Sequence, residues 1–389
     1  MVRLLIKLFI KPSEDPRDAK TRRAYGILCS MVGVGLNVFL FASKYFVGML
    51  SGSIAIMADA FNNLSDAGSS IITLIGFKFA GLKADAEHPF GHGRFEYISG
   101  FIVAAAIILM GVELVKSSVA KILSPSPVDT GLLTMGILLL SVCVKIYMCI
   151  YNRSVGKMID SSAMKATAMD SLSDSVATSV VFLSMLVMKF TGVNVDGWCG
   201  VVVAIFILYT GYNAAKDTLS PLLGQPPSPE LIEQIKELTL SHKEIVGIHD
   251  LVVHDYGPGR LMISLHGEVP GNGDIFELHD AIDQVEKELK EKLGCEAVIH
   301  MDPIAVDDEE VSTLKNSVAD LVKMIDDQLT IHDFRMVKGP THTNLIFDLV
   351  VPFEVKLSDS EVVEQIQHLV REKWGNYFVV VNVDHSYVL

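Results

Sequence analysis

Long apolar runs separated by short polar stretches fill the first 215 residues, whereas the remainder of the chain has mixed polarity. A helix needs about 20 predominantly apolar residues to cross the hydrocarbon core of a lipid bilayer. Six stretches reach this length, so the pattern predicts a membrane α-helical bundle over 25–215, preceded by a segment 1–24. The expected spans are 25–50, 54–80, 95–119, 130–151, 163–190 and 195–215.

Polar pairs interrupt the second and fifth of these spans. Asn62 and Asp66 lie four residues apart in one span, and Asp170 and Asp174 in the other. Residues at this spacing share one helix face. A charged side chain near the bilayer centre costs about 2.5–3.5 kcal/mol on insertion scales, and such residues mark ion or proton pathways. Two such helices side by side would form a cage of four oxygen ligands, which indicates a metal-ion transporter.

The chemistry of these four side chains favours a hard cation. Carboxylate and amide oxygens suit Mn²⁺, Mg²⁺ and Ca²⁺, whereas imidazole and thiolate favour Zn²⁺, Cu and Ni²⁺. Asp59 and Asn63, on the same stretch of helix, are interpreted as auxiliary ligands. Hydrogen bonds between helices, worth about 0.6–2 kcal/mol, explain an asparagine but explain three aspartates poorly. Because metal ligands must be deprotonated, the same carboxylates can take up protons when the metal leaves.

Lysine and arginine predict the orientation of the bundle, since cytoplasmic loops carry an excess of both. Basic residues gather before the first span, after the second and after the fourth, whereas the loops on the opposite side contribute only Lys121 and Lys189. Both termini are therefore expected to be cytoplasmic, in a multi-pass protein of the plasma membrane. The short apolar run from Leu4 to Ile10 is broken by Lys7, so it does not resemble a signal peptide.

The C-terminal part predicts two small α/β units in tandem, over 225–305 and 308–389. In the first, a helix, two strands, a second helix and a third strand follow a proline-rich linker. The order then recurs, and Ile331-His332-Asp333-Phe334 echoes Ile248-His249-Asp250-Leu251. An internal repeat of about 80 residues is the economical interpretation.

Charge and cysteine content narrow the function classes. The net charge of −14 lies mainly in the C-terminal half, which argues against nucleic acid as a partner and is compatible with cations. The five cysteines show no CxxC pairing and are interpreted as buried thiols. The chain carries no motif of a hydrolase, kinase or nucleotide-binding enzyme, so we do not expect an enzyme, nor a cofactor other than the metal itself.

Two further groups have the residue types of metal ligands. The loop after the second span carries Asp85, His88 and His92. The ordinary alternative for this group is a solvated loop that binds no metal. For the histidines of the first α/β unit, named next, the alternative is that each is an isolated surface histidine. The first α/β unit carries a second set on its strands and second helix: His249, His266, His279, His300 and Asp302.

The second α/β unit has lost most of these histidines. At the matching positions it carries His332, Asp348, Asn382 and Asp384. We therefore expect weak or absent metal binding there, and a role in packing instead.

In their order along the chain, these features resemble the cation diffusion facilitator family over about residues 20–304. The resemblance rests on six spans with the polar quartet, the loop His88-Pro89-Phe90-Gly91-His92-Gly93-Arg94, and the ending Ile299-His300-Met301-Asp302-Pro303. It implies a homodimer that exports a divalent metal from the cytoplasm in exchange for protons, with a ferredoxin-like cytoplasmic domain. It also implies that the loop residues and the histidines of the first unit bind metal. The tail after about Asp307 lies outside the usual family length.

The resemblance also bears on the metal. Zinc-transporting members have an aspartate or histidine where this chain has Asn62, and a histidine where it has Asp170. The string from Asp59 to Asp66 is similar to that of bacterial manganese-exporting members. We therefore expect Mn²⁺. Alternatives are a Fe²⁺, Co²⁺ or Zn²⁺ exporter of the same family, a membrane-tethered metal sensor or dimerisation scaffold, and an ion channel.

Overall fold

The computed structural model describes residues 2–10, 19–51, 54–124, 131–191, 195–304, 308–352 and 355–385. The chain divides into two compact units. The helical unit comprises Met1–Gln225 together with the turn Asp255–Arg260, and the α/β unit comprises Pro226–His254 and Leu261–Leu389.

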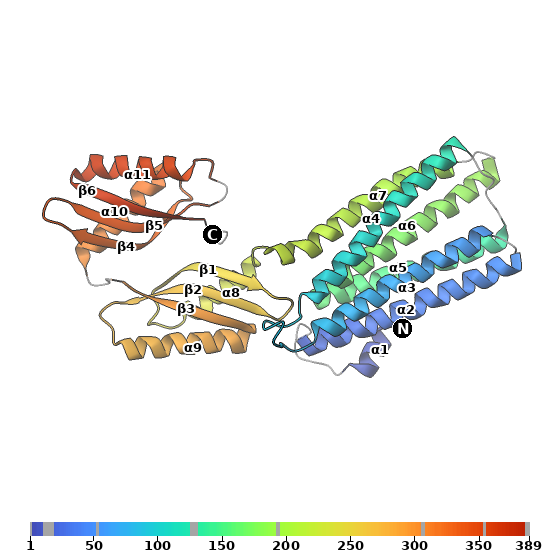
Figure 1. Cartoon of the computed structure of the whole chain (residues 1–389), viewed down its shortest axis with the longest axis horizontal. Helices are drawn as coiled ribbons and strands as arrows, with labels where there is room; N and C mark the ends of the chain where they lie inside the picture. The colour runs from blue at the N-terminus through green and yellow to red at the C-terminus, as the bar shows by residue number, and fades with distance from the viewer. Residues whose placement is uncertain are drawn as a thin grey trace. The chain divides into compact units, whose positions relative to one another are not determined.

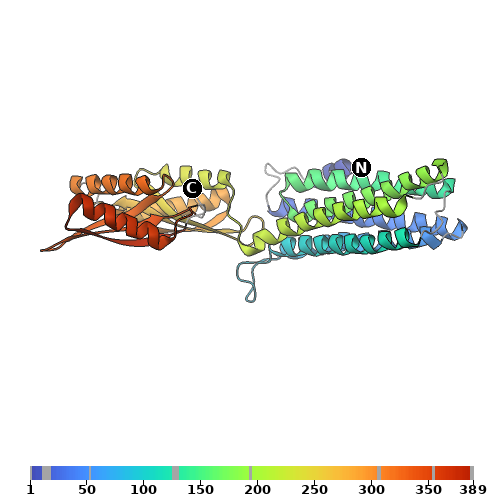
Figure 2. The same ribbon diagram turned by 90° about the horizontal axis from the view of Figure 1, so that it is seen from above.

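Long helices that run alongside one another form the helical unit (Figures 1 and 2). They pack most extensively as the pairs α2 with α3, α4 with α7 and α5 with α6. The helices are α1 (Val2–Phe9), α2 (Ala19–Ser51), α3 (Ile54–Ala80), α4 (Phe95–Leu123), α5 (Leu132–Met158), α6 (Ser162–Thr191) and α7 (Asp196–Leu223).

Five helices in the described part of the chain, α2 and α4 to α7, are long and apolar enough to cross a membrane. The predicted second span is the 27-residue helix α3, but it is not among these five. Asn62, Asn63, Asp66 and several serines lower its hydropathy. The predicted sixth span, 195–215, is shorter than the helix at its C-terminal end, because α7 continues to Leu223 and is followed by Gly224, whose φ is 90°. A helix does not stop where its apolar run stops.

Small residues allow α4 and α7 to approach closely. A Cβ atom added at Gly111 would lie 2.9 Å from Leu208 Cδ2, and one at Gly197 would lie 2.7 Å from Ile122 Cγ1. Glycine removes this obstacle and is enriched at helix interfaces in membranes for that reason. The closely packed pair of α4 and α7 forms one side of the helical bundle.

The α/β unit consists of two lobes with the same element order. In each lobe, two helices and a three-stranded sheet enclose a separate apolar core. The first lobe contains α8 (Pro229–Leu240), β1 (Gly247–Asp255), β2 (Leu261–Pro270), α9 (Ile275–Leu293) and β3 (Cys295–Ile304). The second contains α10 (Glu309–Ile325), β4 (Thr330–Lys338), β5 (Thr343–Val350), α11 (Asp359–Trp374) and β6 (Tyr377–Asp384).

The sheets have the orders β1-β2-β3 and β4-β5-β6, and the last strand of each runs parallel to its neighbour. Capping side chains start the helices where the sequence predicts them. Asp274 accepts backbone hydrogen bonds at the start of α9, and Ser358 forms a capping box with Glu361 at the start of α11. The observed order of elements agrees with the predicted order in both lobes (Figure 1).

All five cysteines are free thiols. Cys29, Cys149 and Cys295 are buried, as the sequence predicts, but Cys143 is exposed on the surface of α5. An exposed apolar side chain on such a helix is compatible with a lipid-facing surface.

Candidate metal sites

Three aspartates converge in the helical unit. Asp66 comes from α3, and Asp170 and Asp174 come from α6. One carboxylate oxygen from each lies within 4.8 Å of the others. Asp66 and Asp170 are 9% and 6% exposed. The spacing of four on α6 and the packing of α3 against α6 therefore assemble three of the four predicted ligands.

The fourth predicted ligand, Asn62, is exposed. Its neighbour Asn63 is 3% exposed, and its side-chain amide donates a hydrogen bond of 3.4 Å to Asp66 Oδ2. The carbonyl oxygen of Asn63 is buried without a hydrogen-bond partner. The amide that contacts an aspartate of the cluster is thus Asn63, which the sequence predicts only as an auxiliary ligand. The side chain of Asp59 lies outside the described residues.

A lysine that the sequence reasoning missed lies between the carboxylates. Lys145 of α5 places its Nζ 2.7 Å from Asp66 Oδ2 and 2.6 Å from Asp174 Oδ2, and its side chain is 2% exposed. Three carboxylates and one ammonium leave two formal negative charges in this cluster. The signal was available, since Lys145 is a charged residue inside one of the most apolar predicted spans.

The predicted loop group also comes together. His92 Nε2 lies 3.5 Å from Asp85 Oδ2, and His88 Nδ1 lies 3.6 Å from Asp85 Oδ1. The backbone N–H of His88 donates to Asp85 and lowers the pKa of this carboxyl group below its ordinary value. His92 Nδ1 contacts the Lys83 carbonyl oxygen at 3.2 Å, a contact that orients Nε2 toward Asp85. The three side chains fit a small divalent-cation site.

In the first lobe, three strands bring a second predicted group together. Asp302 Oδ2 of β3 lies 2.9 Å from His266 Nδ1 of β2 and 3.3 Å from His249 Nε2 of β1. His300 lies beside them, with Nε2 3.3 Å from Asp302 Oδ1. Burial lowers the pKa of His249, but Asp250 and Asp302 outweigh it, so the pKa is above its ordinary value.

His279 is the predicted ligand that the structure does not bring to this cluster. It lies on α9, its side chain is 67% exposed, and Nδ1 is 3.5 Å from Asp283 Oδ2 one turn later. Its distance in sequence from the strands gave no information on which face of α9 it occupies.

The second lobe also brings polar side chains together. Ligand atoms of His332, Asp348 and Asp384 lie within 4.8 Å of one another, and His332 also groups with His249 and Asp250 of the first lobe. Burial, with His249 nearby, lowers the pKa of His332, and burial raises the pKa of Asp348. Both shifts favour the neutral forms of these side chains. The loss of the other histidines is visible in the sequence, but the groups that His332 faces depend on the tertiary structure.

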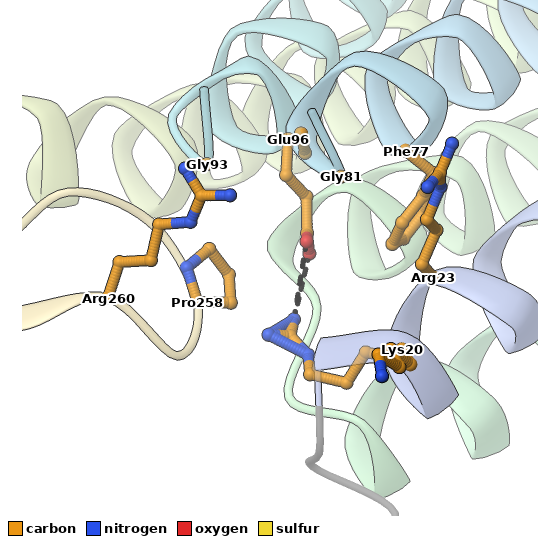
Figure 3. A pocket seen from close by; sticks show the side chains of 10 residues that line it. Lys20, Arg23, Phe77, Gly81, Gly93, Glu96, Pro258 and Arg260 are labelled. Carbon is orange, nitrogen blue, oxygen red and sulfur yellow. Dashed lines mark hydrogen bonds and ion pairs between the residues drawn. The ribbon is translucent and has the colours of Figure 1, made fainter. Parts of the chain in front are cut away.

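A basic pocket in the helical unit is not a cation site. It has a volume of about 120 Å³ and includes a single carboxylate, Glu96 (Figure 3). The dashed line at Glu96 marks its ion pair with Arg22, at 3.0 Å. Positive charge predominates in the lining, which comprises Lys20, Arg22, Arg23, Phe77, Ala80, Gly81, Gly93, Glu96, Pro258 and Arg260.

Comparison with known proteins gives two family matches. Residues 30–223 match the model of the cation efflux transmembrane domain, and residues 227–304 match that of the cation efflux protein cytoplasmic domain. The second lobe, from α10 onward, lies beyond both matches.

Similar proteins include the uncharacterized transporter MJ0449 of Methanocaldococcus jannaschii. It is 31% identical over 277 residues, which are 71% of this chain and 96% of that protein. The cation-efflux pump FieF of Salmonella typhi is 24% identical over 288 residues, 73% of this chain and 96% of the pump. FieF of Salmonella newport has the same identity and coverage.

Proposed function

The chain belongs to the cation efflux family, the cation diffusion facilitators, and from this premise we propose that it exports Mn²⁺ from the cytoplasm in exchange for protons. As a member, it is a multi-pass membrane protein and a divalent cation exporter. The proposal concerns the metal, the counter-ion, and the inclusion of α3 as a sixth span.

The cluster of Asp66, Asp170 and Asp174 is the observation that supports this proposal most directly. Carboxylate oxygens suit hard cations, and Mn²⁺ ranks below other first-row metals in raw affinity. A site selective for Mn²⁺ must therefore omit the nitrogen and sulfur donors that its competitors prefer. Asp170 stands where zinc transporters of the family have a histidine, and Asn63 adds an amide rather than an imidazole.

The Lys145 ammonium and the metal ion can alternate as the positive charge beside the aspartates. Without metal, its ammonium holds Asp66 and Asp174 together and reduces their repulsion. An arriving dication competes for the same oxygens, so the ammonium must withdraw. After release on the far side, protons and the returning ammonium restore the metal-free arrangement. Inward proton movement supplies about 2.3 kcal/mol per charge per 100 mV of membrane potential.

We place both termini in the cytoplasm, with the protein in the plasma membrane as a homodimer. The cytoplasmic domain that the family model matches over 227–304 supports dimerisation. The loop group and the first-lobe group are then cytoplasmic metal sites. Their mixed imidazole and carboxylate donors suit Zn²⁺, Fe²⁺ or Co²⁺ as well as Mn²⁺.

Transport by purified protein in proteoliposomes tests the proposal. The wild type should move Mn²⁺ against a proton gradient, and Asp174→Asn should abolish transport, because it removes a carboxylate from the cluster. Asp217→Asn is the matched control, since Asp217 is an exposed carboxylate on α7. Equal Mn²⁺ transport by Asp174→Asn and the wild type would remove the assigned site.

A different metal of the same family is the second candidate, and the imidazole-rich cytoplasmic groups favour it. A panel of Mn²⁺, Fe²⁺, Co²⁺ and Zn²⁺ at equal free concentration separates the two. Preferred transport of Zn²⁺ would favour this second candidate, in which the cytoplasmic groups and the membrane cluster bind the same metal. Uptake that is independent of the proton gradient would identify a channel instead of an exchanger.

A further inference from the structure

A row of imidazoles and carboxylates joins the two lobes of the α/β unit. His332 of β4 is 7% exposed, and its ring stacks on that of His249 of β1 with a centroid separation of 4.2 Å and an interplanar angle of 28°. The contact therefore joins equivalent positions of the two lobes, each the histidine of an Ile-His-Asp sequence.

Both ring nitrogens of the buried His332, Nδ1 and Nε2, lack hydrogen bonds. Buried polar atoms in proteins nearly always form hydrogen bonds, so an imidazole with no hydrogen bond at either ring nitrogen requires an explanation. A bound cation is one of the few explanations that place a ligand at such atoms.

The spacing of the donors fits a shared cation. His332 Nε2 lies 3.5 Å from Asp250 Oδ1, and Asp250 Oδ2 lies 3.4 Å from His249 Nδ1. These separations are long for hydrogen bonds, which peak near 2.9–3.0 Å. Tetrahedral ligands about 2.0–2.1 Å from one zinc ion are about 3.3 Å apart. The donors therefore stand at the separation of ligands around one ion.

We propose that His332 and Asp250 bind one divalent cation between the lobes, with His249 as a third ligand. One ligand atom from each of these three side chains lies within 4.8 Å of the others. Mixed imidazole and carboxylate donors select borderline metals such as Zn²⁺, Fe²⁺ and Co²⁺ over Mg²⁺ and Ca²⁺. The defining ligands come from different lobes, which distinguishes this site from the first-lobe group around Asp302.

The backbone at Asp250 supports the assignment of this carboxylate. Asp250 and its equivalent Asp333 both have positive φ, 52° and 50°, directly after their histidines. Asp333 forms an ion pair with Arg335 two residues later in its own strand. The carboxylate of Asp250 instead lies beside His249, His266 and His332. The two equivalent aspartates thus have different partners, and of the two it is Asp250 that lies at the proposed cation site.

Binding at this site would tie the second lobe to the first. Because residues beyond 304 lie outside both family matches, this coupling is a property of the chain rather than of the cytoplasmic domain that the family shares. The site is independent of the proposed transport function, since it would respond to cytoplasmic metal whether or not Mn²⁺ is the exported ion.

Zinc binding to the full-length protein in detergent tests the site. The background carries Asp170→Asn and Asp174→Asn, which disable the membrane cluster. Zn²⁺ is titrated against a chromophoric chelator, and hydrogen exchange of β1 and β4 is followed by mass spectrometry with and without Zn²⁺. The test variant is His332→Ala. The matched control is His368→Ala, because His368 is exposed on α11 of the same lobe and lies beside Glu372.

We expect His332→Ala to weaken one zinc site by about 100-fold or more, since loss of even an outer-shell partner costs 10–100-fold. It should also abolish the zinc-dependent protection of β4. Asp250→Asn, in the other lobe, should have the same two effects, and His368→Ala should have neither. Unfolding of the His332 variant would appear as lost protection of α10 and α11 without zinc, and Asp250→Asn then decides alone. Unchanged zinc affinity in both variants, or exchange of β1 and β4 that does not respond to Zn²⁺, would overturn the proposal.

Discussion

Replacement of Lys145 by methionine tests how the membrane cluster is held together without metal. The substitution keeps an unbranched side chain of similar length and removes the ammonium that lies 2.7 Å from Asp66 and 2.6 Å from Asp174. At an effective dielectric constant of about 20, each such pair contributes about 6 kcal/mol of Coulomb energy. Desolvation cancels much of this, and breaking a buried ion pair costs about 3–5 kcal/mol net.

This energy opposes metal binding in the wild type, because the dication must displace the ammonium from the same oxygens. Local relaxation and protonation of the carboxylates recover part of it in the variant. If half is recovered, the remainder of about 1.5–2.5 kcal/mol corresponds to about 10–70-fold tighter Mn²⁺ binding in Lys145→Met. Tighter binding should slow release, so the maximal transport rate should fall.

Two measurements check this expectation. Mn²⁺ affinity is measured by calorimetry on the purified protein, and transport is measured in proteoliposomes at saturating Mn²⁺. Lys145→Arg keeps the charge and should stay near the wild-type affinity. Lys189→Met is the matched control, because Lys189 is an exposed lysine in the last turn of α6. Weaker Mn²⁺ binding in Lys145→Met would refute the reasoning, since the ammonium would then organise the ligands rather than compete for them.

Three further predictions concern the metal, a thiol and a core. Asp170→His should shift transport from Mn²⁺ toward Zn²⁺, because it adds the donor that zinc prefers; an unchanged metal profile in proteoliposomes would count against the hardness argument. Burial raises the pKa of Cys295 to about 11, so about one thiol in 10³ is ionised at pH 8. Iodoacetamide should therefore modify Cys295 only after the first lobe unfolds, with the denatured protein as the control. Rapid labelling of the native protein would contradict the burial of this thiol. Phe347→Ala should destabilise the second lobe by about 3–5 kcal/mol, since Phe347 is fully buried; urea unfolding followed by hydrogen exchange measures the loss, and exposed Phe378→Ala should change it little.

Much of the helical unit could be predicted from the sequence. The apolar runs gave the long helices within a few residues at most ends, because hydrophobic length is a local property. The pairing of Asp170 with Asp174 followed from helix periodicity alone. The end of α7 did not, since a helix continues wherever its backbone hydrogen bonds continue, whatever the polarity of its last turns.

The amide at the membrane cluster shows the limit of periodicity. Asn62 and Asn63 are adjacent, and both lie within one turn of Asp66. Which of them is buried in the bundle depends on the rotation of α3 against its neighbours, and the packing of side chains sets that rotation. The structure buries Asn63 and leaves Asn62 exposed.

The sequence by itself determined which elements form and which residue types each of them carries, because both follow from neighbours along the chain. Only the tertiary structure decided which side chains from distant elements meet. Lys145 reaches Asp66 across 79 positions of sequence, and His332 reaches Asp250 from the other lobe. Periodicity reports the face of one element, whereas a metal site requires the faces of several elements at once. Their relative placement is set by the packing of whole helices and sheets.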